Sequence, residues 1–158
     1  MDFFTSPGMF FDGFPFCRIL FFIMFLNDNI RRMQFKIDTK EKIVIFRLEE
    51  AGLDAKMAAD FEKTVLATPN LETSNLILDL HSLQSAAPEA LEAIFTVYQH
   101  RYDHGLSAAV SGLNKVLTAQ LSVQHPEMLN IVPTESEAID MVMMEDFERE
   151  LDSEMNND

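Results

Sequence analysis

The sequence of 158 residues contains one cysteine, five glycines and few basic residues. The single cysteine, Cys17, excludes a disulfide within one chain and a metal site built from cysteines. The glycines at 52, 105 and 112 do not have the spacing of a phosphate-cradling loop. With 12 Lys and Arg against 26 Asp and Glu, the net charge is −14. This charge argues against nucleic acids and anionic membranes as partners. It favours a basic protein partner, or serves solubility alone.

The sequence also lacks an apolar run long enough to span a membrane, which takes about 20 residues. The cleanest run, Ile19–Leu26, has eight residues and lies in a segment, 1–32, that holds nine of the 14 phenylalanines. A secretory signal is not indicated, because the basic pair Arg31–Arg32 follows the apolar run. We expect residues 1–32 to lie outside the folded domain, which then begins at Met33. A membrane-associating tail and an extra packed element are the alternatives.

From Met33 onward, the hydrophobic pattern alternates between strands and helices. Residues 34–39 and 43–48 form a predicted hairpin, and 75–80, 106–113 and 128–133 are further strands. Predicted helices cover 53–67, the stretch from Pro88 to the glycine at 105, 114–123, and a last helix after the capping box Thr134–Glu137. Strands that alternate with helices imply an α/β fold with a mixed, mostly parallel sheet of about four or five strands and about four helices.

Two of the predicted helices have apolar positions that help to define the core. In the helix over 114–123, we expect Val116, Leu117 and Leu121 to point inward. The final helix continues with Ile139, Val142, Met143 and Phe147 as its apolar positions. Beyond residue 151, we expect residues 152–158 to form an acidic tail.

Few residues offer catalytic chemistry. His100 and His104 lie one helical turn apart, but a metal site needs a third ligand. Two histidines in the last turn of a helix also interact favourably with the negative end of the helix dipole, which explains the pair without a metal. Asp79 interrupts an apolar strand, and we favour a role in capping backbone N–H groups over a ligand site. Ser82 and Ser85 have no general base placed beside them by the pattern. The sequence therefore predicts no enzyme, no metal and no cofactor; a small hydrolase or metal enzyme that uses Asp79, Ser82 and the histidine pair is an alternative.

The stretch from Met33 to Leu151 resembles the STAS domain family, best known through bacterial anti-sigma factor antagonists. "LILDLHSL" resembles the family's strand that ends in Asp-Leu-Ser-Gly-Val, with Asp79 at the acidic position. "EALEAIFTVYQHRYDHGLSAAVSGLNKVL" resembles the helix, glycine and strand that follow, and "LNIVPTESEAIDMV" resembles the final strand and helix. The resemblance implies a STAS-like fold and a cytoplasmic regulatory module that binds a protein, such as an anti-sigma factor or another regulator with a basic surface.

In this family, the loop before the second helix carries a serine that a partner kinase phosphorylates. Alignment at Asp79 and Leu91 places Pro88 at that serine, so no phosphorylation is expected at this position; Glu89 follows it and Ser85 lies three residues early. The resemblance implies a partner-binding surface that consists of Asp79, Ser82, Ser85, Ala87, Pro88 and Glu89. Since STAS domains also serve membrane transporters, an accessory subunit of a transporter is the alternative function.

Overall fold

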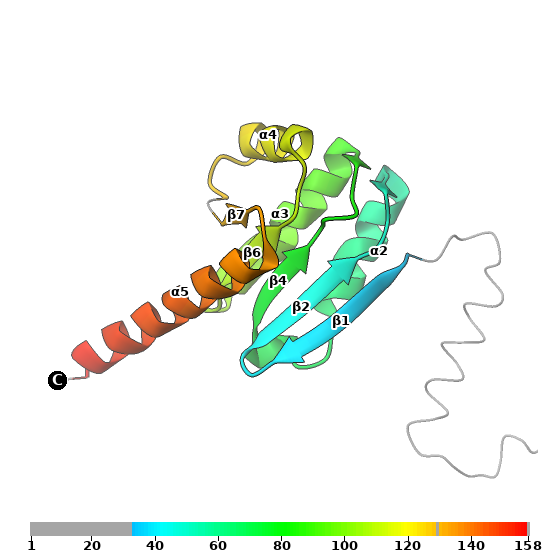
Figure 1. The fold of residues 1–158 in the computed structure, drawn as a ribbon. Coiled ribbons are helices and arrows are strands. Elements are labelled where there is room, and N and C mark those ends of the chain that lie inside the picture. The colour runs from blue at the N-terminus through cyan, green and yellow to red at the C-terminus, as the bar shows by residue number, and fades with distance from the viewer. Residues whose placement is uncertain (1–32, 129, 158) are drawn as a thin grey trace, which may run out of the picture. The chain divides into compact units, whose positions relative to one another are not determined.

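A computed structural model describes residues 33–128 and 130–157, so the predictions for residues 1–32 lie outside the described part of the chain. Five strands form one sheet in the order β1-β2-β4-β6-β7 (Figure 1). Their bounds are β1 Phe35–Lys40, β2 Ile43–Leu48, β4 Asn75–Asp79, β6 Ala108–Ser111 and β7 Ile131–Val132. β1 and β2 form the antiparallel hairpin, and the other neighbouring pairs are parallel. The predicted α/β class with a mixed, mostly parallel sheet is confirmed.

Within the described residues, the α-helices are α2 Ala55–Leu66, α3 Pro88–Asp103, α4 Lys115–Gln124 and α5 Glu135–Met155, and a short 3-10 helix covers Leu71–Thr73. Three of the α-helices begin with a side-chain cap. Asp54, Asn114 and Thr134 accept hydrogen bonds from the backbone N–H three residues ahead, at 57, 117 and 137. α3 begins with Pro88 in its first turn, where the missing N–H costs no hydrogen bond.

Helices cover both faces of the sheet, and the alternation of side chains along each strand explains the two layers of core. In β2, Val44, Phe46 and Leu48 face the larger core cluster, which includes residues of α2, α3 and α4. Ile43 and Ile45 of the same strand face the smaller cluster, to which α5 contributes Ala138 and Val142. The central strand β4 is buried along its whole length, which is usual for a strand with parallel neighbours on both sides.

A hydrogen-bonded network also fixes α5 to the sheet. Tyr102 of α3 donates to Glu145 Oε1 over 2.7 Å, and the Asn130 amide donates to Glu145 Oε2 over 3.0 Å. The same amide donates to the Ala108 carbonyl of β6 over 3.1 Å. Burial raises the pKa of Tyr102 above its usual value, and the bond to Glu145 raises it further. This network fixes which side of α5 faces the sheet.

Several details differ from the expectations. Val116, predicted to point inward, is 65% exposed, because α4 turns only Leu117 and Leu121 fully into the core. In α5, Met143 and Phe147 are exposed, and the helix runs past 151 to Met155, so part of the expected acidic tail is helical. The sequence pattern also missed two short strands, β3 (Gly52–Leu53) and β5 (Ser85–Ala86), which pair in parallel as a second sheet.

Candidate protein-binding site

The loop between β4 and α3 is held in place by the small sheet of β3 and β5. The Gln84 and Ser85 N–H groups both donate to the Ala51 carbonyl, over 2.7 and 3.1 Å. Ala87 N–H donates to the Leu53 carbonyl over 2.9 Å. Leu83 is buried, so the loop is also attached to the core by a side chain. These contacts give the start of α3 a defined position, as a site on a loop requires.

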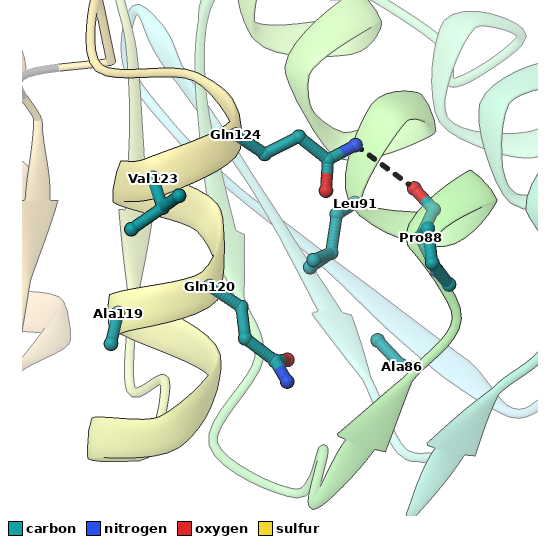
Figure 2. Close-up of a pocket in the computed structure, with 7 residues that line it drawn as sticks. All are labelled: Ala86, Pro88, Leu91, Ala119, Gln120, Val123 and Gln124. Atoms are coloured by element: carbon teal, nitrogen blue, oxygen red, sulfur yellow. Dashed lines mark hydrogen bonds between the residues drawn. The ribbon is translucent and has the colours of Figure 1, made fainter.

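α4 forms a second wall beside the start of α3, and its two ends are hydrogen-bonded to the loop and to α3. Asn114, which caps α4, donates from its side-chain amide to the Gln84 carbonyl over 3.2 Å. At the other end, the Gln124 side-chain amide donates to the Pro88 carbonyl over 3.3 Å (Figure 2). The spacing between the two walls is therefore set by polar contacts at both ends of α4.

An open, mainly apolar groove of about 580 Å³ lies between these walls. Figure 2 shows the side chains that line it, from the end of β5, the first turn of α3 and α4: Ala86, Pro88, Leu91, Ala119, Gln120, Val123 and Gln124. Val123 is 84% exposed, although it is an aliphatic side chain on a helix. An exposed apolar groove with polar groups at its rim is typical of a surface that binds another protein.

The predicted partner-binding residues do not all meet at this groove. Pro88 lines it; Ala87, half-buried, is the N-cap residue of α3, and Glu89 is exposed in the first turn. Ser85 is exposed in β5 and Ser82 is half-buried in the preceding turn. Asp79, at 7% exposure, belongs to a polar network that includes α5. The sequence pattern missed the lining residues of α4. The only signal for them was Val123, an apolar residue that is not among the positions of this helix assigned to the core.

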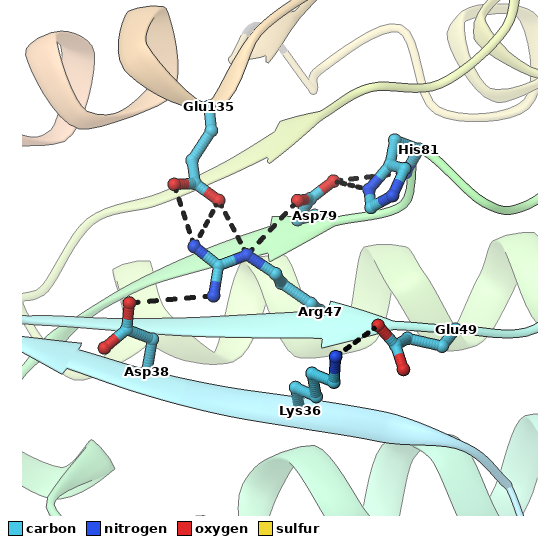
Figure 3. A network of polar contacts seen from close by, with 7 residues as sticks. All are labelled: Lys36, Asp38, Arg47, Glu49, Asp79, His81 and Glu135. Carbon is cyan, nitrogen blue, oxygen red and sulfur yellow. Dashed lines mark hydrogen bonds and ion pairs between the residues drawn. The ribbon is translucent and has the colours of Figure 1, made fainter.

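The Asp79 network lies at the carboxyl ends of β2 and β4 (Figure 3). Arg47 forms two hydrogen bonds with Glu135 at the start of α5, over 3.0 and 2.9 Å, and its Nε lies 3.6 Å from Asp79 Oδ2. The other Asp79 oxygen accepts from the His81 N–H over 3.1 Å and lies 2.8 Å from His81 Nδ1. Asp79 therefore caps a backbone N–H of the following turn, as we favoured, and also links two strands to α5.

An aspartate beside a histidine raises the question of a nucleophile. Ser111, the register partner of Asp79 on β6, is fully buried, so a substrate cannot reach its hydroxyl. Ser82 makes no hydrogen bond to Asp79 or His81 in the described part of the chain. The site thus has an Asp79–His81 pair without an exposed hydroxyl bonded to it, whereas nucleophilic catalysis needs a nucleophile in contact with its base.

The His100–His104 pair lies at the end of α3, with His100 half-buried and His104 exposed. The two rings stack with centroids 4.2 Å apart, and His104 Nδ1 lies 2.8 Å from the His100 carbonyl oxygen. Burial lowers the pKa of His100, and the neighbouring Arg101 and His104 lower it further. Among residues 33–128 and 130–157, no group of three or more His, Cys, Asp or Glu is placed to hold a metal ion.

Comparison with solved structures identifies the fold. The chain superposes on a Thermotoga maritima protein assigned as an anti-sigma factor antagonist, with a TM-score of 0.58 and 22% identity over 69% of this chain and 94% of that chain. It superposes on the phosphorylated form of SpoIIAA, a Bacillus cell fate determinant, with a TM-score of 0.52 and 16% identity over 69% and 99%.

A third similar structure is the murine anion transporter solute carrier 26 family member A9, with a TM-score of 0.61 and 12% identity over 82% of this chain. The chain spans about a quarter of that transporter, 25% of its length. Neither a protein-family model nor a curated protein sequence matches this chain.

The fold is therefore the STAS fold, and the predicted resemblance is confirmed at that level. Within the described residues, no helix is both long and apolar enough to cross a membrane.

Proposed function

We propose that this chain is a non-catalytic regulatory module of STAS type that binds a protein partner through the groove between α3 and α4 and the loop before α3. The observation that carries the proposal is the apolar lining of this groove, with Val123 exposed and the walls fixed by the Asn114 and Gln124 hydrogen bonds. The anti-sigma factor antagonists that share the fold support a regulatory role. The resemblance favours a cytoplasmic bacterial protein whose partner is an anti-sigma factor or a similar regulator.

The first turn of α3 supports a module without covalent control at this position. A phosphate at a helix start adds up to about −2 charge and changes the contact surface of the helix. Here Pro88 occupies the first turn and has no hydroxyl to accept a phosphate. Glu89 adds a permanent negative charge there, and this charge interacts favourably with the positive N-terminal end of the helix dipole. We infer that binding depends on partner concentration and not on phosphorylation of α3.

The net charge of −14 favours a partner with a basic surface. A standard interface covers about 800 Å² on each partner, so contacts must extend beyond the groove to the loop and to the exposed side of α3. Ser85, Glu89 and Glu92 are exposed there and provide polar groups for the rim.

The test is a pull-down from the native cell at low salt, with crosslinking, using wild-type protein and the Val123→Glu variant. We expect a defined partner to be lost from Val123→Glu, because a charge in the apolar groove must be desolvated on binding. The matched control is Val116→Glu, a 65% exposed apolar position on α4 outside the groove, which should retain the partner. Equal recovery by Val123→Glu, or no partner even after crosslinking, would contradict the proposal.

A second candidate function is an accessory subunit of a membrane transporter. The observation that favours it is the superposition on part of the anion transporter, which covers 82% of this chain. Fractionation of native cells separates the two functions: the regulatory module remains in the supernatant, whereas a transporter subunit sediments with membranes. The intact mass of the native protein, measured by mass spectrometry, identifies the first residue of the chain and shows whether a phosphate is attached.

A further inference from the structure

The outward side of α5 carries a continuous apolar stripe. Met143, Met144, Phe147, Leu151 and Met155 are 52, 63, 58, 43 and 70% exposed. Their spacing of three to four residues places them on one side of the helix over three turns. We call these five residues the α5 stripe. These side chains are exposed, so the stripe lies on the surface of α5 and is separate from the two core clusters described above.

The stripe cannot turn inward, because the opposite side of α5 is attached to the domain. Ala138 and Val142 are buried against the sheet, and Glu145 accepts the bonds from Tyr102 and Asn130. Further along, Arg149 donates to the Ser107 hydroxyl over 2.6 Å. Figure 1 shows that the C-terminal turns of α5 continue beyond the strands of the sheet. A partner can therefore approach the C-terminal part of the stripe from either side of the helix.

The charges next to the stripe decide which partner fits. α5 contains nine acidic residues and one basic residue, Arg149. Asp140, Glu148 and Glu154 are exposed next to the stripe and form no ion pair with another residue of the described chain. Two copies of the chain that met through their α5 stripes would bring these like charges together, which opposes association. A basic segment would instead place opposite charges along both edges.

We propose that the α5 stripe is a second docking surface, whose occupant is a basic amphipathic helix of a partner protein. Apolar side chains at positions i, i+3, i+4 and i+7 of that helix would contact the stripe. Its Lys and Arg side chains would face Asp140, Glu148 and Glu154. Three of the five stripe residues are methionines, whose flexible side chains adapt to different apolar partners. The groove between α3 and α4 lies on the other face of the sheet, so the two surfaces can be occupied together.

The test uses the full chain and two synthetic peptides in a fluorescence anisotropy titration. The first peptide has Leu at i, i+3, i+4 and i+7 and Lys at its other positions; the second has the same composition in scrambled order. We expect the ordered peptide to bind at least tenfold more tightly than the scrambled one. Phe147→Ser with Leu151→Ser should weaken binding of the ordered peptide at least tenfold. Val116→Ser, at a 65% exposed position on α4 outside both the stripe and the groove, should leave it unchanged.

A charge variant keeps the proposal testable if the serine variant is less well folded. Asp140→Asn, Glu148→Gln and Glu154→Gln together retain the stripe and should weaken the ordered peptide severalfold at low salt, with a smaller salt dependence. Equal binding of the two peptides, or unchanged binding by both variants, would overturn the proposal. Wild-type dimers in analytical ultracentrifugation that dissociate in the serine variant would also overturn it, since they assign the stripe to a second copy.

Discussion

Gly112 and Gly105 offer a matched pair of substitutions that tests how tightly the loop beside Asp79 is packed. Both glycines have left-handed backbone angles, with φ of +81° and +72°. Their surroundings differ. A Cβ at Gly105 would have no heavy atom within 4 Å, whereas a Cβ at Gly112 would lie 2.8 Å from His81 Cβ and 2.9 Å from His81 Cα and N. Replacement of each by alanine therefore separates the cost of the backbone angle from the cost of the contact.

The expected magnitudes follow from these two terms. The left-handed conformation costs a residue with a side chain about 1–2 kcal/mol, and this term is common to both variants. A forced contact in a packed region adds about 1–3 kcal/mol, which applies only to Gly112→Ala. We expect Gly105→Ala to lose about 1–2 kcal/mol of unfolding free energy and Gly112→Ala about 2–5 kcal/mol. Because backbone atoms of His81 form part of the contact, a side-chain rotation alone cannot relieve it.

The assay is equilibrium unfolding in urea for wild type and both variants, with the midpoint and slope fitted for each. The contact should also displace the turn that contains His81, whose N–H donates to Asp79, so the backbone amide resonance of His81 should shift in Gly112→Ala. Gly105 lies at the end of α3, and its alanine variant should leave that resonance unchanged.

Equal losses of free energy by the two variants would refute the reasoning. They would mean that the loop moves away from residue 112 at no cost, and that the positions of Asp79 and His81 are not fixed by packing. An unchanged His81 resonance in Gly112→Ala would lead to the same conclusion even if the free energies differed.

Three further predictions concern α3 and α5. Tyr102→Phe should lower the free energy of unfolding by about 1.5–3 kcal/mol in urea unfolding, because the hydrogen bond that the Tyr102 hydroxyl donates to the Glu145 carboxylate is lost. Equal stability would show that α5 does not depend on this bond. Thr134→Ala should cost about 1 kcal/mol through loss of the α5 cap, and Thr134→Ser should restore it in the same assay. The His100 pKa is lowered in the folded state, so the stability that this group contributes is fully present above its unfolded pKa of about 6.5. It is lost as the pH falls below that value and through the lower pKa of the folded state. His100→Gln should therefore reduce the loss of stability below this pH, and an NMR titration of His100 with a midpoint at or above 6.5 would contradict the prediction.

Local patterns in the sequence were sufficient for most of the fold. The hairpin, the strand over 75–79 and the cap at Thr134 depend on residues close together in the chain, and the structure agrees with each of them. The pairing of β3 with β5 was not predictable in this way. It joins two-residue segments more than 30 positions apart, which have no periodicity of their own.

The candidate site was predicted only in part for the same reason. Pro88 at the start of α3 was evident from the sequence, but the groove also needs Ala119 and Val123 from a helix that begins 27 residues later. Val116 illustrates the limit. Helical spacing alone permits several rotations of a short helix, and the packing of Leu117 and Leu121 selects one that leaves the valines outside.

By itself, the sequence determined the order of the strands of the main sheet and of the four long helices, the negative charge and the absence of a hydroxyl at Pro88, because composition and local hydrogen bonding depend on near neighbours. Only the tertiary structure decided that Asp79 links β4 to α5 through Arg47, that α4 forms the second wall of the groove, and that the apolar side of α5 beyond Val142 faces solvent. These depend on contacts between segments far apart in the chain, and a helix has no fixed rotation until such contacts form.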